Sequence, residues 1–139
     1  MVVYNPIWIQ FILYVAIVSF PCLSGYMFYL AYEALPKSGL SGAGIFIFLG
    51  AGVAYISYIG LLLAKFVPAK VVFDDSQFTV EIKGTKNSYA WSDIAEVKNY
   101  EISQILKLVD SSGVTIYVVD HMTPGYKSFA EKVSESVGI

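Results

Sequence analysis

The first 64 residues of this chain almost lack charge: Glu33 and Lys37 are their only charged side chains. Two stretches without any charge, residues 7–32 and 40–64, flank that pair. Each is longer than the ~20 residues that cross ~30 Å of hydrocarbon as a helix. The whole chain is 14% charged, well below the ~25% of a typical soluble domain. We therefore predict two transmembrane helices joined at residues 33–39, a helical hairpin.

Cysteine and histidine are almost absent as well. One cysteine, Cys22, excludes a disulfide framework, and one histidine, His121, leaves no second imidazole for a zinc site. Neither predicted span contains an ionisable carboxylate, amine or imidazole, which is atypical of transporters and proton channels. The N-terminus lacks the basic segment of a signal peptide, so we expect no cleavable leader.

Arginine is missing altogether, since all nine basic residues are lysines. Residues 66–139 carry seven lysines and ten acidic residues, a net charge of −3. Such a domain is repelled by an anionic membrane surface and by nucleic acid, and it lacks the guanidinium groups that bind phosphate in a bidentate manner. Lys83 and Lys86 around one turn form a local basic pair, which leaves membrane-lipid sensing as an alternative.

Small side chains recur on one predicted face of the second span. Close backbone approach at such residues drives helix association in lipid. Two interpretations stay open, packing on the first span or a seam with another protein or a second copy. The residues of this face are Gly39, Ala43, Gly50, Ala54 and Ser57.

Lysines indicate the orientation of the hairpin. Lys65 and Lys70 follow the second span, whereas Lys37 alone lies in the turn and is accompanied by Glu33. By the positive-inside rule, the turn faces outward. We predict a multi-pass membrane protein with both termini in the cytoplasm.

Beyond the spans the apolar period changes from helical to two, which is typical of half-buried strands. Thr123-Pro124 then resembles a helix start, and Phe129, Ala130, Val133 and Val137 form one helical stripe. We predict a transmembrane hairpin over residues 1–66 and a small α+β domain over 67–139, an antiparallel curled sheet or open barrel of about six strands with a C-terminal helix. The predicted strands are 71–73, 78–82, 88–91, 94–102, 104–109 and 114–119.

No catalytic constellation emerges from the sequence. Ser111, Asp120 and His121 are the residue types of a hydrolase triad, but neighbours such as Asp120 and His121 are expected to point to opposite faces of a strand. No glycine-rich phosphate loop follows a strand. We expect no catalytic residue, cofactor or metal, and the protein is predicted not to be an enzyme.

The segment from Ser88 to Val97 carries a family resemblance. A strand, Trp91, a polar turn at Ser92-Asp93 and then Ile94-x-x-Val97 is similar to the bacterial pleckstrin-homology-like (PH-like) domains. The layout most resembles the YcxB-like group, small membrane proteins with two N-terminal spans and such a C-terminal domain. The resemblance implies a PH-like fold in the bacterial inner membrane and no known chemistry. Trp91 and Ile94 are expected to be core, and Ser92 and Asp93 a turn or cap.

These observations favour a function in binding. We hypothesise a membrane-anchored protein-interaction module that contacts lipids around its spans and another membrane or membrane-associated protein. It would be an accessory subunit, a scaffold or a neutralising partner such as an immunity protein. A homo-oligomer is compatible with the sequence, nucleic acid is not an expected partner, and a lipid-sensing PH-like module is the alternative.

Overall fold

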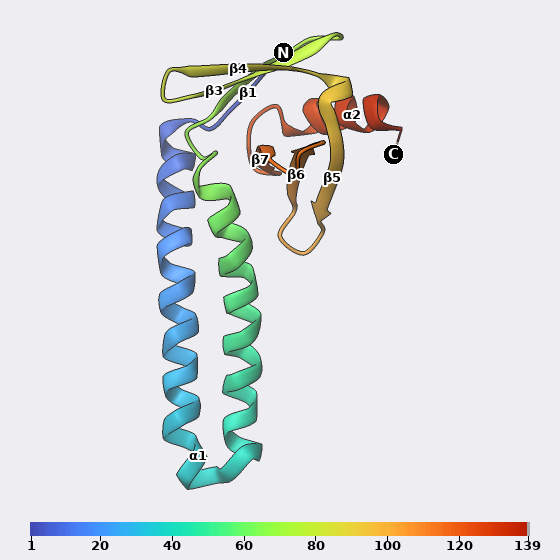
Figure 1. Cartoon of the computed structure of the whole chain (residues 1–139). Coiled ribbons are helices and arrows are strands. Elements are labelled where there is room, and N and C mark those ends of the chain that lie inside the picture. The colour runs from blue at the N-terminus through green and yellow to red at the C-terminus, as the bar shows by residue number, and fades with distance from the viewer. Residues whose placement is uncertain (139) are drawn as a thin grey trace. The chain divides into compact units, whose positions relative to one another are not determined.

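The computed structural model describes residues 1–138, which Figure 1 draws from the N-terminus in blue to the C-terminus in red. Contacts divide the chain into two units. Unit 1 comprises Met1–Phe11 and Lys65–Ile139, and unit 2 comprises Ile12–Ala64. The first 11 residues therefore belong to the same unit as the residues that follow the long apolar segment in the sequence.

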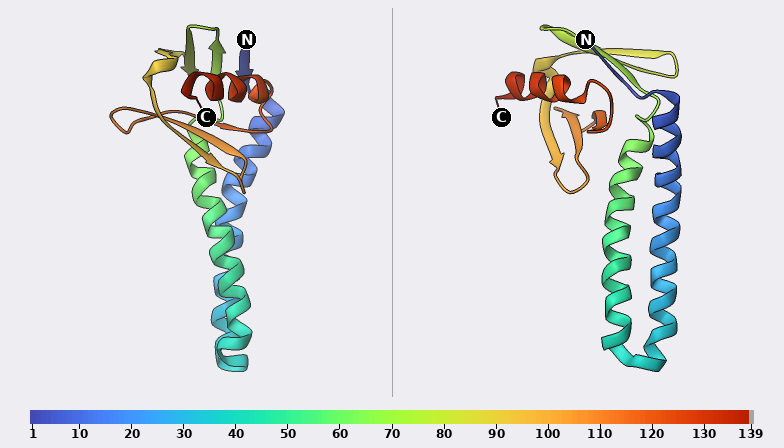
Figure 2. Two further views of the ribbon diagram at one scale, coloured as in Figure 1. Left: turned by 90° about the vertical axis from the view of Figure 1, so that its right-hand side faces the viewer. Right: turned by 180° about the vertical axis from the view of Figure 1, so that it is seen from behind.

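Unit 2 is built from one long helix, α1 (Ile7–Ala64), whose start at residues 7–11 belongs to unit 1. Gly39 alone has non-helical dihedral angles, φ 64° and ψ −160°, a region open essentially to glycine. The chain turns back at Gly39, so that the two arms of α1, one before and one after this residue, lie side by side (Figures 1 and 2). The hydroxyl of Ser24 donates to the carbonyl oxygen of Gly50 at 2.9 Å and links the arms.

This result corrects the prediction of two helices separated by a loop at residues 33–39. Residues 33–38 are helical, including Pro36, and the Glu33–Lys37 ion pair of 3.8 Å has the i,i+4 spacing that supports a helix. Pro36 does not break the helix, and only Gly39 leaves the helical region. Pro21 likewise lies inside α1 without interrupting it.

Unit 1 contains two antiparallel sheets and a C-terminal helix, α2 (Tyr126–Val137), as Figure 2 shows from two sides. The first sheet has the order β1-β2-β3-β4 and the second β5-β6-β7, with no closed barrel among the described residues. A short 3₁₀ helix, η1 (Trp91–Asp93), connects the two sheets. The strands are β1 (Val2–Tyr4), β2 (Lys70–Phe73), β3 (Gln77–Ile82), β4 (Thr85–Ala90), β5 (Ile94–Tyr100), β6 (Ile105–Asp110) and β7 (Thr115–Asp120).

Strand β1 was not predicted, because a three-residue strand directly before a long apolar helix has no visible period. It pairs with β2, with Val2 opposite Val72 and Tyr4 opposite Lys70. The amide of Asn5 donates to the carbonyl oxygen of Val67 at 3.1 Å, which ties together the segments that lead into and out of α1. The sheets thus hold seven strands rather than six, and the seventh comes from the segment assigned to the hairpin.

The core of unit 1 is centred on Phe129 of α2, which is fully buried. Its ring lies 5.3 Å from Phe73 and 6.0 Å from Phe78 of the first sheet, and 5.6 Å from Tyr117 of the second. One residue of the helix therefore contacts both sheets. Of the predicted stripe of Phe129, Ala130, Val133 and Val137, Phe129 and Val133 are buried. Helix α2 itself begins later than predicted, at Tyr126 after Gly125 (φ 88°), rather than at Thr123 and Pro124.

The role of β1 can be tested with two neighbouring valines. Val3 is fully buried, whereas Val2 on the same strand is 43% exposed. We expect Val3→Asp to lower the free energy of unfolding of unit 1 by ~3 kcal/mol or more, because it buries an unpaired carboxylate. Val2→Asp should change it by less than about 1 kcal/mol. Limited proteolysis of the full chain in detergent measures both, and equal resistance of the two variants would contradict a structural role for β1.

Candidate interaction surface

Strand β4 forms one edge of the first sheet. It pairs with β3 on one side, and no described strand pairs with its other side. Five of its residues are exposed and Tyr89 is half-buried; the exposed ones are Thr85, Lys86, Asn87, Ser88 and Ala90. The opposite edge of the sheet is covered, because a Cβ on Gly125 would lie 2.5 Å from the carbonyl oxygen of Val2. The β4 edge is therefore available for pairing with another strand.

The turn before β4 determines which backbone groups face outward. Lys83 (φ 50°) and Gly84 (φ 84°) both have positive φ, as a two-residue type I′ hairpin turn requires. In such a hairpin the flanking pair, Ile82 and Thr85, is hydrogen-bonded, and bonded and non-bonded pairs alternate from there. The backbone N–H and C=O groups of Lys86 and Ser88 therefore point away from β3.

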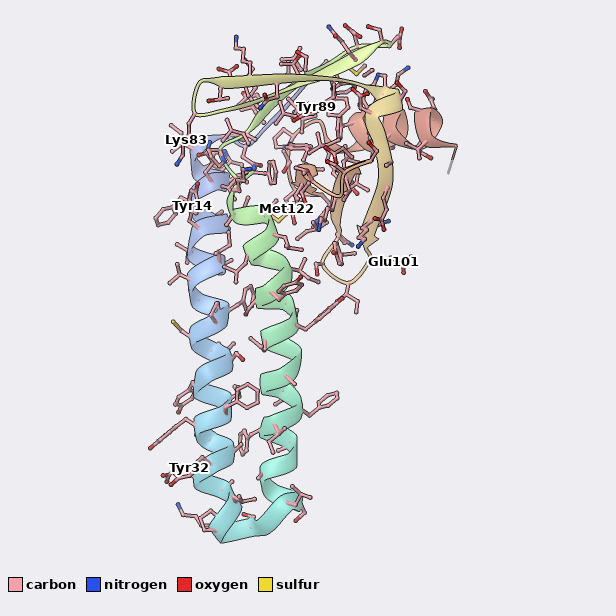
Figure 3. All side chains as sticks on the ribbon, in the orientation of Figure 1. Tyr14, Tyr32, Lys83, Tyr89, Glu101 and Met122 are labelled. Atoms are coloured by element: carbon pink, nitrogen blue, oxygen red, sulfur yellow. The ribbon has the colours of Figure 1, made fainter. Side chains whose placement is uncertain are left out.

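Side chains on both faces fix β4 to β3. The rings of Phe78 and Tyr89 stack with their centroids 5.5 Å apart, and the hydroxyls of Thr79 and Ser88 lie 2.8 Å apart. Figure 3 labels Tyr89 on this strand and Lys83 at its turn. These contacts hold β4 on β3, while the outward N–H and C=O groups of Lys86 and Ser88 have no partner strand among the described residues.

The Trp91 segment follows β4, and Trp91 lies in the 3₁₀ helix η1 rather than in the predicted strand 88–91. Trp91 is 7% exposed, and its Nε1 donates to the carbonyl oxygen of Asp74 at 3.0 Å. Ile94 is buried, whereas Ser92 and Asp93 are exposed. The carboxylate of Asp93 accepts a hydrogen bond from the Ala90 N–H at 2.8 Å, so this outward-facing amide of β4 already has an acceptor.

A concavity of about 280 Å³ lies next to this end of β4. Two carboxylates, Asp93 and Asp110, give it a negative character. Hydrogen bonds from Ser112 and Val114 hold the pKa of Asp110 below its ordinary value, so that carboxylate stays ionised. The lining residues are Tyr89, Ser92, Asp93, Ala95, Asp110 and Ser111.

The small-residue face of the second arm lies largely against the first arm. Ala43 is 1% and Ser57 9% exposed, and a Cβ on Gly50 would approach the Phe28 ring to 3.2 Å. Ala54 is half-buried. Gly39 does not share this face, because it is the non-helical residue where the arms meet. Of the two interpretations, packing on the first span therefore accounts for the buried residues without a partner chain.

The structure does not assemble Ser111, Asp120 and His121. Asp120 and His121 do approach each other, with 3.6 Å between Oδ1 and Nδ1, because β7 ends at Asp120 and the chain turns. The expectation that they point to opposite faces was therefore wrong. Burial raises the pKa of Asp120, against the opposing effects of the Met122 N–H and His121. Ser111 lies at the other end of β7, in the turn after β6.

No family model matches the chain, and no curated protein matches it. Among residues 1–138, no three histidine, cysteine, aspartate or glutamate side chains are grouped as metal ligands would be. The surface therefore has to be interpreted from its own geometry.

Packing between the arms predicts different effects at two glycines. Gly50→Leu should weaken the hairpin by ~1–3 kcal/mol, because any side chain there meets the Phe28 ring. Gly52→Leu makes the same chemical change where nothing lies within 4 Å, so it should leave the hairpin intact. Thermal unfolding of the detergent-solubilised protein, followed by circular dichroism, compares the two. A hairpin equally stable in both variants would argue against this packing.

Proposed function

We propose that this protein is a membrane-anchored protein-interaction module of the bacterial inner membrane, which acts by binding rather than by catalysis. In this role it serves as an accessory subunit, a scaffold or a neutralising partner, such as an immunity protein, of another membrane or membrane-active protein. The open edge of β4 is the observation that carries the proposal.

The anchor is the apolar helix α1, which is long and apolar enough to cross a membrane by length and composition. Residues 40–64 alone extend ~37 Å as a helix, more than the ~30 Å of a hydrocarbon core. Large apolar side chains point outward along it; Phe48 is 78% and Leu40 73% exposed. Exposed apolar surface of this extent is unfavourable in water and favourable in lipid. Its only two charges, Glu33 and Lys37, pair near the point where the arms meet.

Pairing of β1 with β2 supports an even number of crossings. Residues 2–4 and 70–73 belong to one sheet, so they lie on the same side of any membrane that α1 enters. Lys65 and Lys70 next to the second arm then favour the cytoplasm for that side. Two spans, at about residues 7–32 and 40–64, with both termini in the cytoplasm, fit these constraints.

Labelling with a membrane-impermeant thiol reagent tests this topology. In a Cys22→Ser background, Ser38→Cys should be labelled in intact cells and Ser111→Cys only after lysis. Both serines are exposed, so accessibility within the protein does not distinguish them. The reverse pattern would move unit 1 outside the cell. Labelling of both sites in intact cells would contradict the membrane-spanning hairpin.

A PH-like domain is our interpretation of the fold of unit 1. Two antiparallel sheets with a C-terminal helix against them correspond to the curled sheet and closing helix that the resemblance implies. The Trp91 segment lies at the junction of the sheets, where its ring is 5.9 Å from that of Phe129. The resemblance itself stays a prediction.

Partner binding at β4 would occur by strand addition. An incoming strand forms main-chain hydrogen bonds to an exposed edge, and side-chain contacts next to it supply the specificity. Lys86 and Ser88 offer the outward N–H and C=O groups, and the acidic concavity at Asp93 and Asp110 adjoins the far end of the strand. These features favour a partner segment that is extended and carries a basic residue beyond the paired stretch.

Lipid sensing remains the alternative function. The net charge of −3 over residues 66–139 opposes docking on an anionic leaflet, and the ammonium group of Lys86 is already 3.8 Å from Glu81. Lys83 stays as one unpaired basic group at the β3–β4 turn among the described residues. A patch this small supplies little phosphate affinity.

Two substitutions at Ser88 test strand addition. Ser88→Pro removes an outward N–H and leaves the hydrogen bonds to β3 in place, because Ser88 faces away from that strand. Ser88→Ala loses the same hydroxyl contact with Thr79 but keeps the N–H. We expect pull-down from a mild-detergent extract to recover one membrane-associated protein in near-stoichiometric amount with wild type and Ser88→Ala. Ser88→Pro should lose most of it.

Other results would redirect the assignment. Retention of the partner by Ser88→Pro would place binding elsewhere on the protein. If no partner is recovered, and the protein binds anionic vesicles in a salt-dependent way, the lipid-sensing alternative replaces the interaction module. Sedimentation of the purified protein separates a homo-oligomer from a complex with a different chain.

A further inference from the structure

One large apolar side chain of unit 1 stands out from its sheets. Ile102 is 80% exposed and lies in the turn that joins β5 to β6. The turn is locally strained. Gln104 adopts φ 53°, which costs a non-glycine residue energy, and the hydroxyl of Ser103 is buried without a hydrogen-bond partner among the described residues. Unit 1 presents the large apolar side chain of Ile102 at this turn.

A second exposed apolar side chain lies on the adjacent turn. Met122 is 49% exposed and follows the end of β7. The N–H of His121 donates to the carbonyl oxygen of Gln104 at 3.1 Å and joins this turn to the one that carries Ile102. We name the pair of Ile102 and Met122 the apolar tip.

Two lysines lie behind the apolar tip. Lys98 of β5 is directly opposite Lys107 of β6, although like charges in this arrangement repel. Lys98 is 3.6 Å from Glu96, whereas no ion pair of Lys107 occurs among the described residues. The pair lies two residues, or ~7 Å, before the last paired residues of the hairpin. This spacing matches the ~5–8 Å depth of a phospholipid headgroup layer.

The apolar tip belongs to the same unit as the residues on either side of unit 2, which are 7–11 and 65–66. The ring of Phe66, which follows α1 closely, is 5.8 Å from Tyr117 of β7. Tyr117 precedes the end of β7 by three residues, or ~10 Å. Within unit 1, the β5–β6 turn and the first helical turn of α1, residues 7–11, extend from the same side (Figures 1 and 2). The tip therefore lies on the side of unit 1 from which α1 starts.

We propose that the apolar tip inserts into the headgroup–acyl boundary of the phospholipid bilayer as a second membrane contact of unit 1. Ile102 and Met122 supply the buried apolar area, while Lys98 and Lys107 lie at the level of the lipid phosphates. This contact rests on the proposed membrane anchor and adds to it a defined orientation of the domain. It orients the β4 edge relative to the membrane and requires no binding of a particular headgroup.

Glu101 opposes insertion because its carboxylate is exposed beside Ile102 in the same turn (Figure 3). It limits the depth, since an ionised carboxylate does not enter hydrocarbon. Glu96, next to Lys98, reduces the local positive charge. The contact is therefore shallow and depends mainly on the two apolar side chains.

Fluorescent labelling of the full chain in phospholipid vesicles tests the proposal. An environment-sensitive dye is attached to Ile102→Cys, Met122→Cys or Val114→Cys in a Cys22→Ser background. Val114 is the matched control, because it is 59% exposed but lies in the β6–β7 turn, at the other end of β6. We expect a blue-shifted emission at 102 and 122, quenched by lipids with a nitroxide near the headgroup, and no quenching at 114.

A dye at Phe48→Cys, measured with lipids that carry the nitroxide deep in the acyl chain, reports separately on the anchor. Quenching at 48 without quenching at 102 would overturn the apolar tip and leave the anchor standing, whereas no quenching at 48 would contradict the anchor itself. A blue shift at 102 without nitroxide quenching would assign the contact to protein and also overturn the proposal. Adding Ile102→Ser should abolish quenching at 122, while adding Val114→Ser should not, and unchanged quenching after Ile102→Ser would count against the tip.

Discussion

The pairing of β1 with β2 is the constraint on which the arrangement of this chain depends. Three residues before α1 and four residues after it form one antiparallel pair, and the Asn5 amide bonded to Val67 reinforces the junction. Closing a loop the size of α1 costs on the order of 4 kcal/mol in chain entropy. Packing of the two arms, including the Ser24–Gly50 hydrogen bond, offsets part of this cost. The helix is thus an insertion within a sheet rather than an extension at one end of a domain.

The two units are stabilised in different ways. Unit 1 has an aromatic core in which Phe129 contacts rings from both sheets and the indole of Trp91 adds a hydrogen bond to Asp74. Unit 2 keeps small residues such as Ala43 and Gly50 between its arms and exposes large apolar side chains such as Phe48. Such a distribution is the reverse of a water-soluble bundle and agrees with packing by close approach in lipid.

Sequence periodicity predicted the elements with strong local signals. The alternation of Phe78, Val80 and Ile82 indicated β3, and the stripe with Phe129 and Val133 indicated α2. Strand β1 escaped detection because its partner is remote in sequence and only the pairing makes it a strand. The break was predicted over residues 33–39, but residues 33–38 stay helical and only Gly39, the last residue of that range, leaves the helical region. The free edge at β4 could not be predicted from the sequence. It depends on which strands pair, and the sequence of one strand does not show its partner.

The inserted position of α1 has a consequence for biosynthesis. Strand β1 leaves the ribosome first, yet β2 follows only after the whole of α1 has been made. At ~5–20 residues per second, this delay lasts ~3–13 s. During it, Val3 has no partner strand. In the membrane-anchored form that we propose, α1 would enter the bilayer before the first sheet is complete. With that topology, β1 could pair with β2 only after the chain had returned to the side of the membrane on which it began.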